Sequence, residues 1–440
     1  MILADFFHTF INQLKSERID HCVLRNYDGL PFENIGNDID LLINKEHVDT
    51  AIDIILSINN ITVTSLSKRP YVVSVFIYGI EWGENRHALQ LDLVILLAWK
   101  GISYLSVNQV LKHSLYINNS DALLKKPAPF HEALISFFSS YLVGGWIKDK
   151  YQENVQKIFI LEEQNVLRLL TAFLPLKKAE ILIGAVINDD RNLLLSLLPS
   201  IRRYLIKAHL SDNLFRSARA IITHYSAEMV IRYTPFVIDT ICFLGADGSG
   251  KSTVISAVAN ELQGTTKIIA HYHLKPTWGK QENSSHPVTN PHAKPARSAL
   301  FSAGKIIFWL FTYWIDRFFH GHKNPTLKIW DRYYYDLLID PKRYRYGAPM
   351  WFAKMIGTFV PEPDLIILLD APAEVIYARK KEVPLEETVR QRKAYLAFAH
   401  SRKNCIIIDT NKPVEESVAE ACKQILDYLE RRTQKRLGRL

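Results

Sequence analysis

Apolar residues recur along the chain either at helical spacing or in the runs typical of strands. The changes between these two patterns divide the chain into three regions. Residues 236–440 alternate strands and helices in the manner of a doubly wound parallel sheet. Residues 116–235 keep helical spacing and predict an all-helical linking domain. Residues 1–115 predict a small mixed α/β domain with a helix over 5–16, strands at 22–25 and 38–43, a helix from about 46, and strands at 71–82 and 88–97 joined by a turn at 83–87.

The composition is that of an ordinary folded protein. Of the 440 residues, 48% are hydrophobic and 22% are charged, and no long biased stretch interrupts them. The four cysteines lie far apart and predict neither a disulfide framework nor a zinc site, which favours a reducing, cytoplasmic compartment. The first residues carry Asp5 and no cleavage site, and the most apolar segment, 306–315, is too short to cross a bilayer. We therefore expect no secretion signal and no transmembrane segment.

The net charge of +9 bears on the partners of the protein. It fits nucleic acid, an anionic membrane or a phosphate-rich small molecule. We favour a phosphate-bearing small-molecule substrate, because many of the basic residues fall inside motifs of the third region. Specific nucleic-acid binding is not indicated, since the sequence has no helix-turn-helix or finger pattern.

Residues 245–253 read GADGSGKST and match the phosphate-binding loop G-x-x-x-x-G-K-[ST]. The apolar run 236–244 precedes this loop as a buried strand would, and residues 254–262 follow with helical spacing. Lys251 is expected to reach the β- and γ-phosphates, and the Ser252 hydroxyl to hold Mg²⁺. An ordinary Gly/Ser turn before a helix is the alternative. The predicted nucleotide-binding residues are Gly245, Gly248, Ser249, Gly250, Lys251, Ser252 and Thr253.

Three later segments support the loop. A strand at 327–331 ends in Asp331 and Arg332, at the sheet edge where open α/β folds bind ligands. A second strand at 363–370 leads into a helix over 373–383, and a last strand lies at 404–410. That helix and its continuation carry a cationic lid, comprising Arg379, Lys380, Lys381, Arg390 and Arg392. The proline-rich stretch 276–297 is either a loop over the active site or a plain surface excursion.

These motifs resemble the thymidylate kinase family of P-loop nucleoside monophosphate kinases. The resemblance covers about 236–430 and rests on GADGSGKST, the Asp331-Arg332-Tyr333 triplet, PDLIILLDAPAEV with its basic stretch, and CIIIDTNKPVEE. It implies a P-loop kinase fold, ATP and Mg²⁺ at the loop, and an acceptor phosphate bound by Arg332. It also implies that Asp247 lies near an acceptor sugar hydroxyl or the metal shell.

The segment after the triplet departs from that family. A serine- and glutamine-containing helix usually follows there, whereas this chain has YYDLLIDPKRYRYG, with Arg343 and Arg345 as further candidate substrate-binding residues beside Arg332, Arg379 and Arg390. These features are similar to a thymidylate-kinase-like group of bacterial proteins associated with surface polysaccharides. The predicted catalytic residues are Lys251, Asp331 and Asp247. Either carboxylate is a candidate base if the acceptor is a hydroxyl, and neither is needed as a base if it is a phosphate.

Residues 36–43, GNDIDLLI, place Asp38 and Asp40 on one face of a strand, because strand side chains alternate. Asp92 lies on another apolar strand that can pair alongside. Three carboxylates from adjacent strands can hold Mg²⁺, an arrangement that resembles the nucleotidyltransferase superfamily over about residues 20–100. The Gly-Ser turn of that superfamily is missing. Either Arg25 and Asn26 replace it, or the domain has lost transfer activity. A paired surface-aspartate motif is the alternative.

The leading hypothesis is an ATP- and Mg²⁺-dependent phosphotransferase acting on a nucleotide or phosphorylated sugar, joined to a nucleotidyltransferase-like domain. In a second hypothesis, the amino-terminal domain is the enzyme and the P-loop half is a nucleotide-binding regulatory module. A third is a non-catalytic assembly factor that binds ATP. The acidic and basic residues expected around Lys251 argue against the third.

Overall fold

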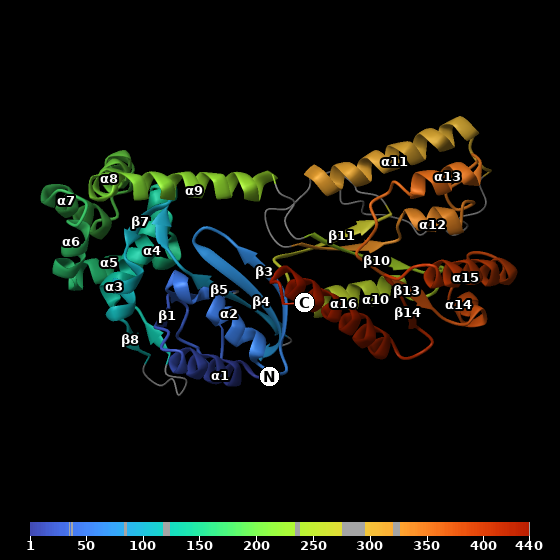
Figure 1. Ribbon diagram of the computed structural model, residues 1–440, viewed down its shortest axis with the longest axis horizontal. Coiled ribbons are helices and arrows are strands. Elements are labelled where there is room, and N and C mark those ends of the chain that lie inside the picture. Colours follow the sequence, from blue (N-terminus) through green and yellow to red (C-terminus); the bar gives the residue numbers. More distant parts are fainter. Residues whose placement is uncertain are drawn as a thin grey trace. The chain divides into compact units, whose positions relative to one another are not determined.

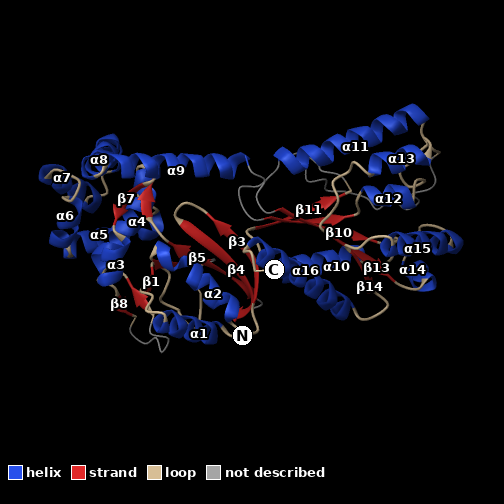
Figure 2. Cartoon of the chain, viewed as in Figure 1, coloured by secondary structure: helices blue, strands red, loops and turns tan. Residues whose placement is uncertain are grey.

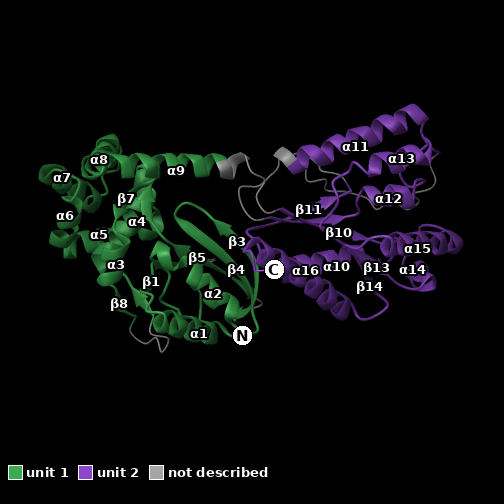
Figure 3. Cartoon of the chain, in the orientation of Figure 1, with its two compact units in different colours: residues 1–231 green, residues 232–440 purple. Residues whose placement is uncertain are grey.

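The structure is a computed structural model of the chain, and it describes residues 1–34, 36, 38–82, 86–117, 124–233, 238–274, 295–319 and 326–439. Two compact units, Met1–Ile231 and Arg232–Leu440, divide the chain (Figure 3). Most of the predicted turn at 83–87, most of the predicted loop at 276–297 and the start of the predicted strand at 236–244 lie outside the described residues. The division into three domains stays a prediction.

The first unit contains a five-stranded sheet in the order β1-β2-β5-β4-β3, of which β1, β3, β4 and β5 are labelled in Figure 1. β2 and β5 are parallel, and the other neighbouring pairs are antiparallel. The predicted strand at 88–97 is shorter in the structure, because β5 ends at Val94 and Leu97 begins a separate hairpin. The elements are α1 Leu3–Ser16, β1 His21–Val23, β2 Asp38–Ile43, the 3-10 helix η1 Lys45–His47, α2 Val48–Ser57, β3 Thr62–Lys68, β4 Val72–Trp82, β5 Arg86–Val94, β6 Leu97–Trp99 and β7 Ile102–Leu105.

Sequence reasoning missed β3. Its segment, TVTSLSK, carries three polar side chains that the fold buries completely or almost completely: Thr64, Ser65 and Ser67. Because polar residues occupy the buried positions, the alternation of apolar and polar residues that marks a strand is absent. Pairing with β4, rather than residue type, makes this segment a strand.

Helices follow the sheet in the first unit (Figure 2). Their core is aromatic and includes Phe137, Phe138, Tyr141 and Phe159, all nearly or fully buried. The predicted helical region therefore shares one core with the preceding sheet region, which contributes residues such as Leu42. The elements are α3 Val107–Lys112, β8 Leu115–Tyr116, β9 Lys125–Lys126, α4 Pro129–Gly144, α5 Asp149–Leu161, α6 Glu163–Leu170, α7 Leu176–Ile187, α8 Arg191–Asp212 and α9 Leu214–Tyr233.

The second unit is built on a five-stranded sheet in the order β11-β12-β10-β13-β14, and all its neighbouring strands run parallel. The predicted α/β class with a parallel sheet is confirmed. The elements are β10 Ile238–Leu244, α10 Lys251–Glu261, β11 Ile268–His273, α11 Ala299–Phe319, β12 Thr326–Asp331, α12 Tyr334–Ile339, α13 Met350–Gly357, β13 Leu365–Asp370, α14 Ala373–Arg379, α15 Leu385–His400, β14 Cys405–Asp409 and α16 Val414–Arg436.

Helices cover both faces of this sheet. Ile241 and Phe243 of β10 pack in one core with α10 and α16, whereas Cys242 and Leu244 pack in another with α11 and α15. Successive side chains of a strand point to opposite faces, so a central strand buried on both sides is apolar at every position. This is why residues 241–244 read as a continuous apolar run.

The predicted helix at 373–383 is shorter in the structure. α14 ends at Arg379, the next residue is extended, and Pro384 precedes α15. Pro384 restricts the residue before it to extended conformations, so it separates this segment from α15. Among the helices that the structure describes, none combines the length and apolar character needed to cross a membrane.

Candidate nucleotide-binding and phosphate-transfer site

The phosphate-binding sequence forms the connection between β10 and α10 (Figure 1). Gly248 and Gly250 have positive φ angles of 94° and 84°, which favour glycine. A side chain at Gly248 would also meet the carbonyl oxygen of Ile376 at 2.5 Å, whereas one at Gly250 would project into open space. The loop is therefore closed against α14 at Gly248 and open at Gly250, beside the start of α10.

The Lys251 side chain is buried at the start of α10. Its Nζ donates to the carbonyl oxygens of Gly245 and Ala246, both at 2.8 Å, and lies 3.8 Å from Asp247 Oδ1. Burial and the positive charge of Arg332 lower the pKa of Lys251 to about 8, although Asp247 acts in the opposite direction. The ammonium group is thus held within the loop itself.

The three serine and threonine side chains predicted at the loop differ in their surroundings. Ser249 is buried, and its Oγ has no hydrogen-bond partner. Ser252 and Thr253 are exposed at the first turn of α10. Their hydroxyl groups are accessible where the helix presents its positive end.

Asp247 joins the loop to the segment after β12. Its two carboxylate oxygens accept hydrogen bonds from Arg332 and from Arg343. Burial raises the pKa of Asp247, but Arg332, Lys251 and Arg343 outweigh it and hold the pKa far below its usual range. The structure therefore brings together Asp247, Lys251, Arg332 and Arg343, four of the residues singled out in the sequence.

Arg332 also donates to Asp336, at 2.7 Å. The Asp336 carboxylate is fully buried and accepts further bonds from Tyr344, at 2.6 Å, and from Tyr395. Burial disfavours the charge of Asp336, but Arg332 and the two phenol groups lower its pKa. Asp336 thus binds one terminal nitrogen of the Arg332 guanidinium, and Asp247 binds the other.

Sequence reasoning did not assign a role to Asp336, Tyr344, Tyr395 or Glu382. Glu382 pairs with Lys380 at 2.6 Å and lies 3.6 Å from Arg343. Arg332 lies before α12 in a left-handed conformation, so helical spacing gives no signal for its contact with Asp336. Tyr395 is distant along the chain, so no local pattern points to it.

Asp331, the last residue of β12, lies beside these groups. One of its carboxylate oxygens is 3.4 Å from His273 Nδ1, and the other is buried without a hydrogen-bond partner. Burial raises the pKa of Asp331, but the His273 hydrogen bond, Lys251 and Arg332 lower it below its usual value. Asp331 is therefore a carboxylate with an unused oxygen close to Lys251.

The other candidate arginines have different partners. Arg345 Nε donates to the carbonyl of Pro295 at 2.9 Å, and Arg379 to that of Thr410 at 2.9 Å. Arg390 pairs with Glu387 at 2.6 Å, and Arg392 with Asp370 at 2.8 Å. In this structure they do not contact Asp247, so their role in substrate binding stays a prediction.

In the first unit, the register of β2 and β5 places Asp40 directly opposite Asp92. Asp38 lies two residues before Asp40 on the same strand. Burial raises the pKa of Asp92, and the negative charges of Asp40 and Asp38 add to this effect. The sequence-predicted acids are thus close enough to interact, but within the described ranges no group of three metal-ligating side chains is arranged around a metal position.

Arg25 forms an ion pair with Asp40. Its Nε donates to Asp40 Oδ2 at 2.5 Å, and its Nη1 lies 3.4 Å from the Tyr151 hydroxyl. Asn26 follows in a left-handed conformation, with a φ of 56°. The segment where the missing Gly-Ser turn was expected therefore supplies a cation to the acidic pair.

Comparisons with known proteins bear on the kinase-like part. No family model matches the chain. "Probable thymidylate kinase 1" of Saccharolobus solfataricus is 26% identical to it over 196 residues, which cover 42% of this chain and 95% of that protein. "Probable thymidylate kinase" of Sulfolobus acidocaldarius is 25% identical over 205 residues, covering 43% and 97%. These similarities support a kinase-type enzyme in part of the chain.

Two further comparisons are narrower. "Probable thymidylate kinase" of Methanothermobacter thermautotrophicus is 28% identical over 145 residues, covering 32% of this chain and 68% of that protein. A solved thymidylate kinase from Ehrlichia chaffeensis is 19% identical, covers 43% of this chain and 99% of its own, and has a TM-score of 0.29.

Proposed function

We propose that the second unit is an ATP- and Mg²⁺-dependent kinase that transfers the γ-phosphoryl group to a phosphorylated small molecule, either a nucleoside monophosphate or a sugar phosphate. The proposal rests on one observation: the Arg332 guanidinium donates a hydrogen bond to the carboxylate of Asp247 in the phosphate loop. It brings an arginine suited to an acceptor phosphate to the same place as Lys251. The similarity to proteins named thymidylate kinase makes thymidylate the first acceptor to test.

The residues present fit a nucleoside triphosphate and Mg²⁺. The open space at Gly250 suits a phosphate group against the backbone N–H groups of the loop and the start of α10. The exposed Ser252 hydroxyl and the unpartnered Asp331 oxygen are hard oxygen ligands of the kind that Mg²⁺ prefers. Bound Mg²⁺ would neutralise phosphate charge and orient the phosphate oxygens.

The ionisation of the carboxylates favours a phosphate acceptor over a hydroxyl. An acceptor hydroxyl must lose its proton to a base, whereas an acceptor phosphate oxygen attacks the γ-phosphorus directly as the bond to the β-phosphate oxygen breaks. Asp247 and Asp331 both have lowered pKa values, which makes them weak bases. Lys251, Arg332 and Arg343 instead supply positive charge where the transferring group carries negative charge.

Label transfer from γ-labelled ATP to thymidylate, other nucleoside monophosphates and sugar phosphates tests the proposal. Wild-type protein should transfer the label, and Lys251→Ala should lower the rate by about two orders of magnitude or more, because it removes a charge that stabilises the transferring group. Lys423→Ala, on an exposed position of α16, is the matched control and should transfer at the wild-type rate. Equal rates for folded Lys251→Ala and wild type would rule out the assignment.

We also propose, as a second candidate, nucleotidyl transfer in the first unit. The facing of Asp40 and Asp92 on parallel strands supports it. The wild-type protein should then transfer label from α-labelled ATP, and Asp40→Ala should abolish this transfer. Asp20→Asn, at a largely exposed position, is the control and should leave the transfer unchanged. Persistence of the reaction in Asp40→Ala would remove this candidate.

A further inference from the structure

The first unit contains a cavity of about 610 Å³ with a basic lining, separate from the acidic pair. Its volume is within the range of small-molecule sites. It lies where β2 and β5 end, because Lys45 follows β2, and Ile95 and Leu96 follow β5. Asp40 and Asp92 lie further back along the same strands.

Positive charge dominates the lining. Five cationic side chains contribute to it and only one carboxylate, Asp49, which lies 3.4 Å from Lys68. The cations come from η1, the end of β3 with the turn that follows it, and α9. They are Lys45, Lys68, Arg69, Arg216 and Arg219. Like charges from separate elements facing one cavity repel one another, so an anion bound between them is strongly favoured.

The wall formed by α9 is held in place by an aromatic contact. The Tyr71 hydroxyl is 2.7 Å from His224 Nδ1, and the two rings stack at a centroid distance of 5.4 Å. The backbone N–H of Gly101 donates to the same hydroxyl at 2.5 Å. The cavity thus has a fixed wall on the α9 side and one apolar surface, formed by residues such as Val73 and Ile95.

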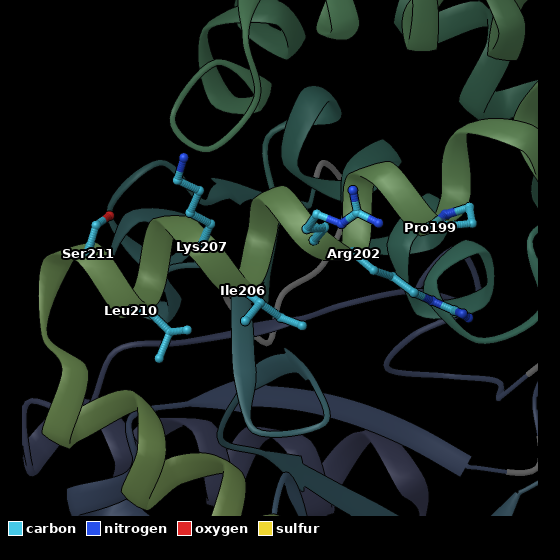
Figure 4. A pocket seen from close by; sticks show the side chains of 7 residues that line it. Pro199, Arg202, Ile206, Lys207, Leu210 and Ser211 are labelled. Atoms are coloured by element: carbon cyan, nitrogen blue, oxygen red, sulfur yellow. The ribbon is translucent and has the colours of Figure 1, made fainter.

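A second cavity in this unit lacks these features. It has a volume of about 730 Å³ and runs along α8, and the seven residues that line it all belong to that helix (Figure 4). It includes two exposed cations, Arg203 and Lys207. With a single wall it cannot enclose a ligand between opposing charges, which makes its cations a suitable control.

We propose that the cavity between α9 and the ends of β2 and β5 is a binding site for a small phosphorylated molecule, distinct from the phosphate loop. Arg216 and Arg219 lie three residues apart on α9, so both can face the cavity and contact one phosphate group. Lys45 and Lys68 supply further positive charge from η1 and the end of β3. The apolar surface accommodates an uncharged part of the ligand.

Titration calorimetry of the full-length chain with inorganic pyrophosphate tests the site. The measurement uses a Lys251→Ala background, which weakens binding at the phosphate loop. One equivalent should still bind, and adding Arg216→Ala and Arg219→Ala should weaken its affinity at least tenfold. Arg203→Ala with Lys207→Ala on α8 removes the same charge and should leave the affinity unchanged. Lys45→Ala with Lys68→Ala should reproduce the loss, so the test does not depend on one variant folding.

Equal affinity for the α9 variant and the α8 control would overturn the proposal, as would a failure of the Lys251→Ala background to bind pyrophosphate. ADP and vesicles containing phosphatidylglycerol distinguish the source of the phosphate. Competition by ADP supports a free small molecule. If the protein sediments with the vesicles but does not bind pyrophosphate, these cations form a membrane-binding surface and the proposal of a small-molecule site is wrong.

Discussion

The guanidinium of Arg332 donates to the carboxylate of Asp247, and this pair connects the end of β12 to the phosphate loop. Arg332 adopts a φ of 70°, and its N–H donates to the carbonyl of Phe243, so its backbone is tied to β10 as well. A residue in this conformation is maintained only where its surroundings hold it. The contact sets the position of the proposed acceptor-binding group relative to the nucleotide loop.

Arg332 and Asp336 should contribute strongly to stability as a pair. Replacing Arg332 by Ala leaves Asp336 buried without its cation, which costs about 3 kcal/mol of the free energy of unfolding. Replacing Asp336 by Asn as well should recover part of that loss, with a coupling of about 1 kcal/mol or more. Denaturant unfolding of the wild type, the two single variants and the double variant measures this coupling. Strictly additive losses would contradict the pairing.

Arg343 should matter for the acceptor more than Arg345 does. Arg343 bonds to Asp247, whereas Arg345 donates to the backbone carbonyl of Pro295. Replacing Arg343 by Ala should therefore raise KM for the acceptor roughly tenfold or more, as expected for the loss of a charge-assisted contact, with little change in KM for ATP. Arg345→Ala is the matched variant and should have the smaller effect. Steady-state kinetics with each substrate varied in turn gives both KM values. A larger rise in the acceptor KM for Arg345→Ala than for Arg343→Ala would refute the assignment.

Several of the residues that the structure brings together around the phosphate loop could be found from the sequence, and their function stays a prediction. The phosphate loop depends on local backbone conformation, and Lys251 and Asp247 belong to it. Arg332 could be found because it directly follows a buried strand that pairs with the strand before the loop. Asp336, Tyr344 and Tyr395 were missed because their contacts depend on the packing of α12 and α15 around one buried carboxylate, and each residue alone has many ordinary roles.

The first unit shows the opposite case. The facing of Asp40 and Asp92 was predicted from two apolar strands, although β3 was not, since buried threonine and serine hid its pattern. The basic cavity could not be predicted from the sequence. Its cations are separated by up to about 170 residues along the chain, and only the docking of α9 brings them together.

His131 should make the first unit less stable in mild acid. Burial, with the nearby charges of His113 and Arg168, lowers the pKa of His131 from 6.5 to about 4. Below pH 6.5 the unfolded chain binds a proton that the folded chain does not, so stability falls from pH 6.5 towards pH 4. The loss attributable to His131 is on the order of 3 kcal/mol. His131→Phe should unfold with a shallower dependence on pH across this window, measured in denaturant. Parallel curves for variant and wild type would exclude His131 as the cause.

Gly101 should control the docking of α9. It has a φ of 88°, and a side chain there would meet the carbonyl oxygen of Ala220 at 2.5 Å. Gly101→Ala therefore strains the backbone and pushes α9 away, at a cost of about 1–3 kcal/mol. Gly184, within α7, has open space around its Cβ position, and Gly184→Ala should stabilise the chain by about 0.5–1 kcal/mol. Amide hydrogen exchange should thus speed up in α9 for Gly101→Ala alone. Unchanged exchange in that variant would mean that α9 is not held through this contact.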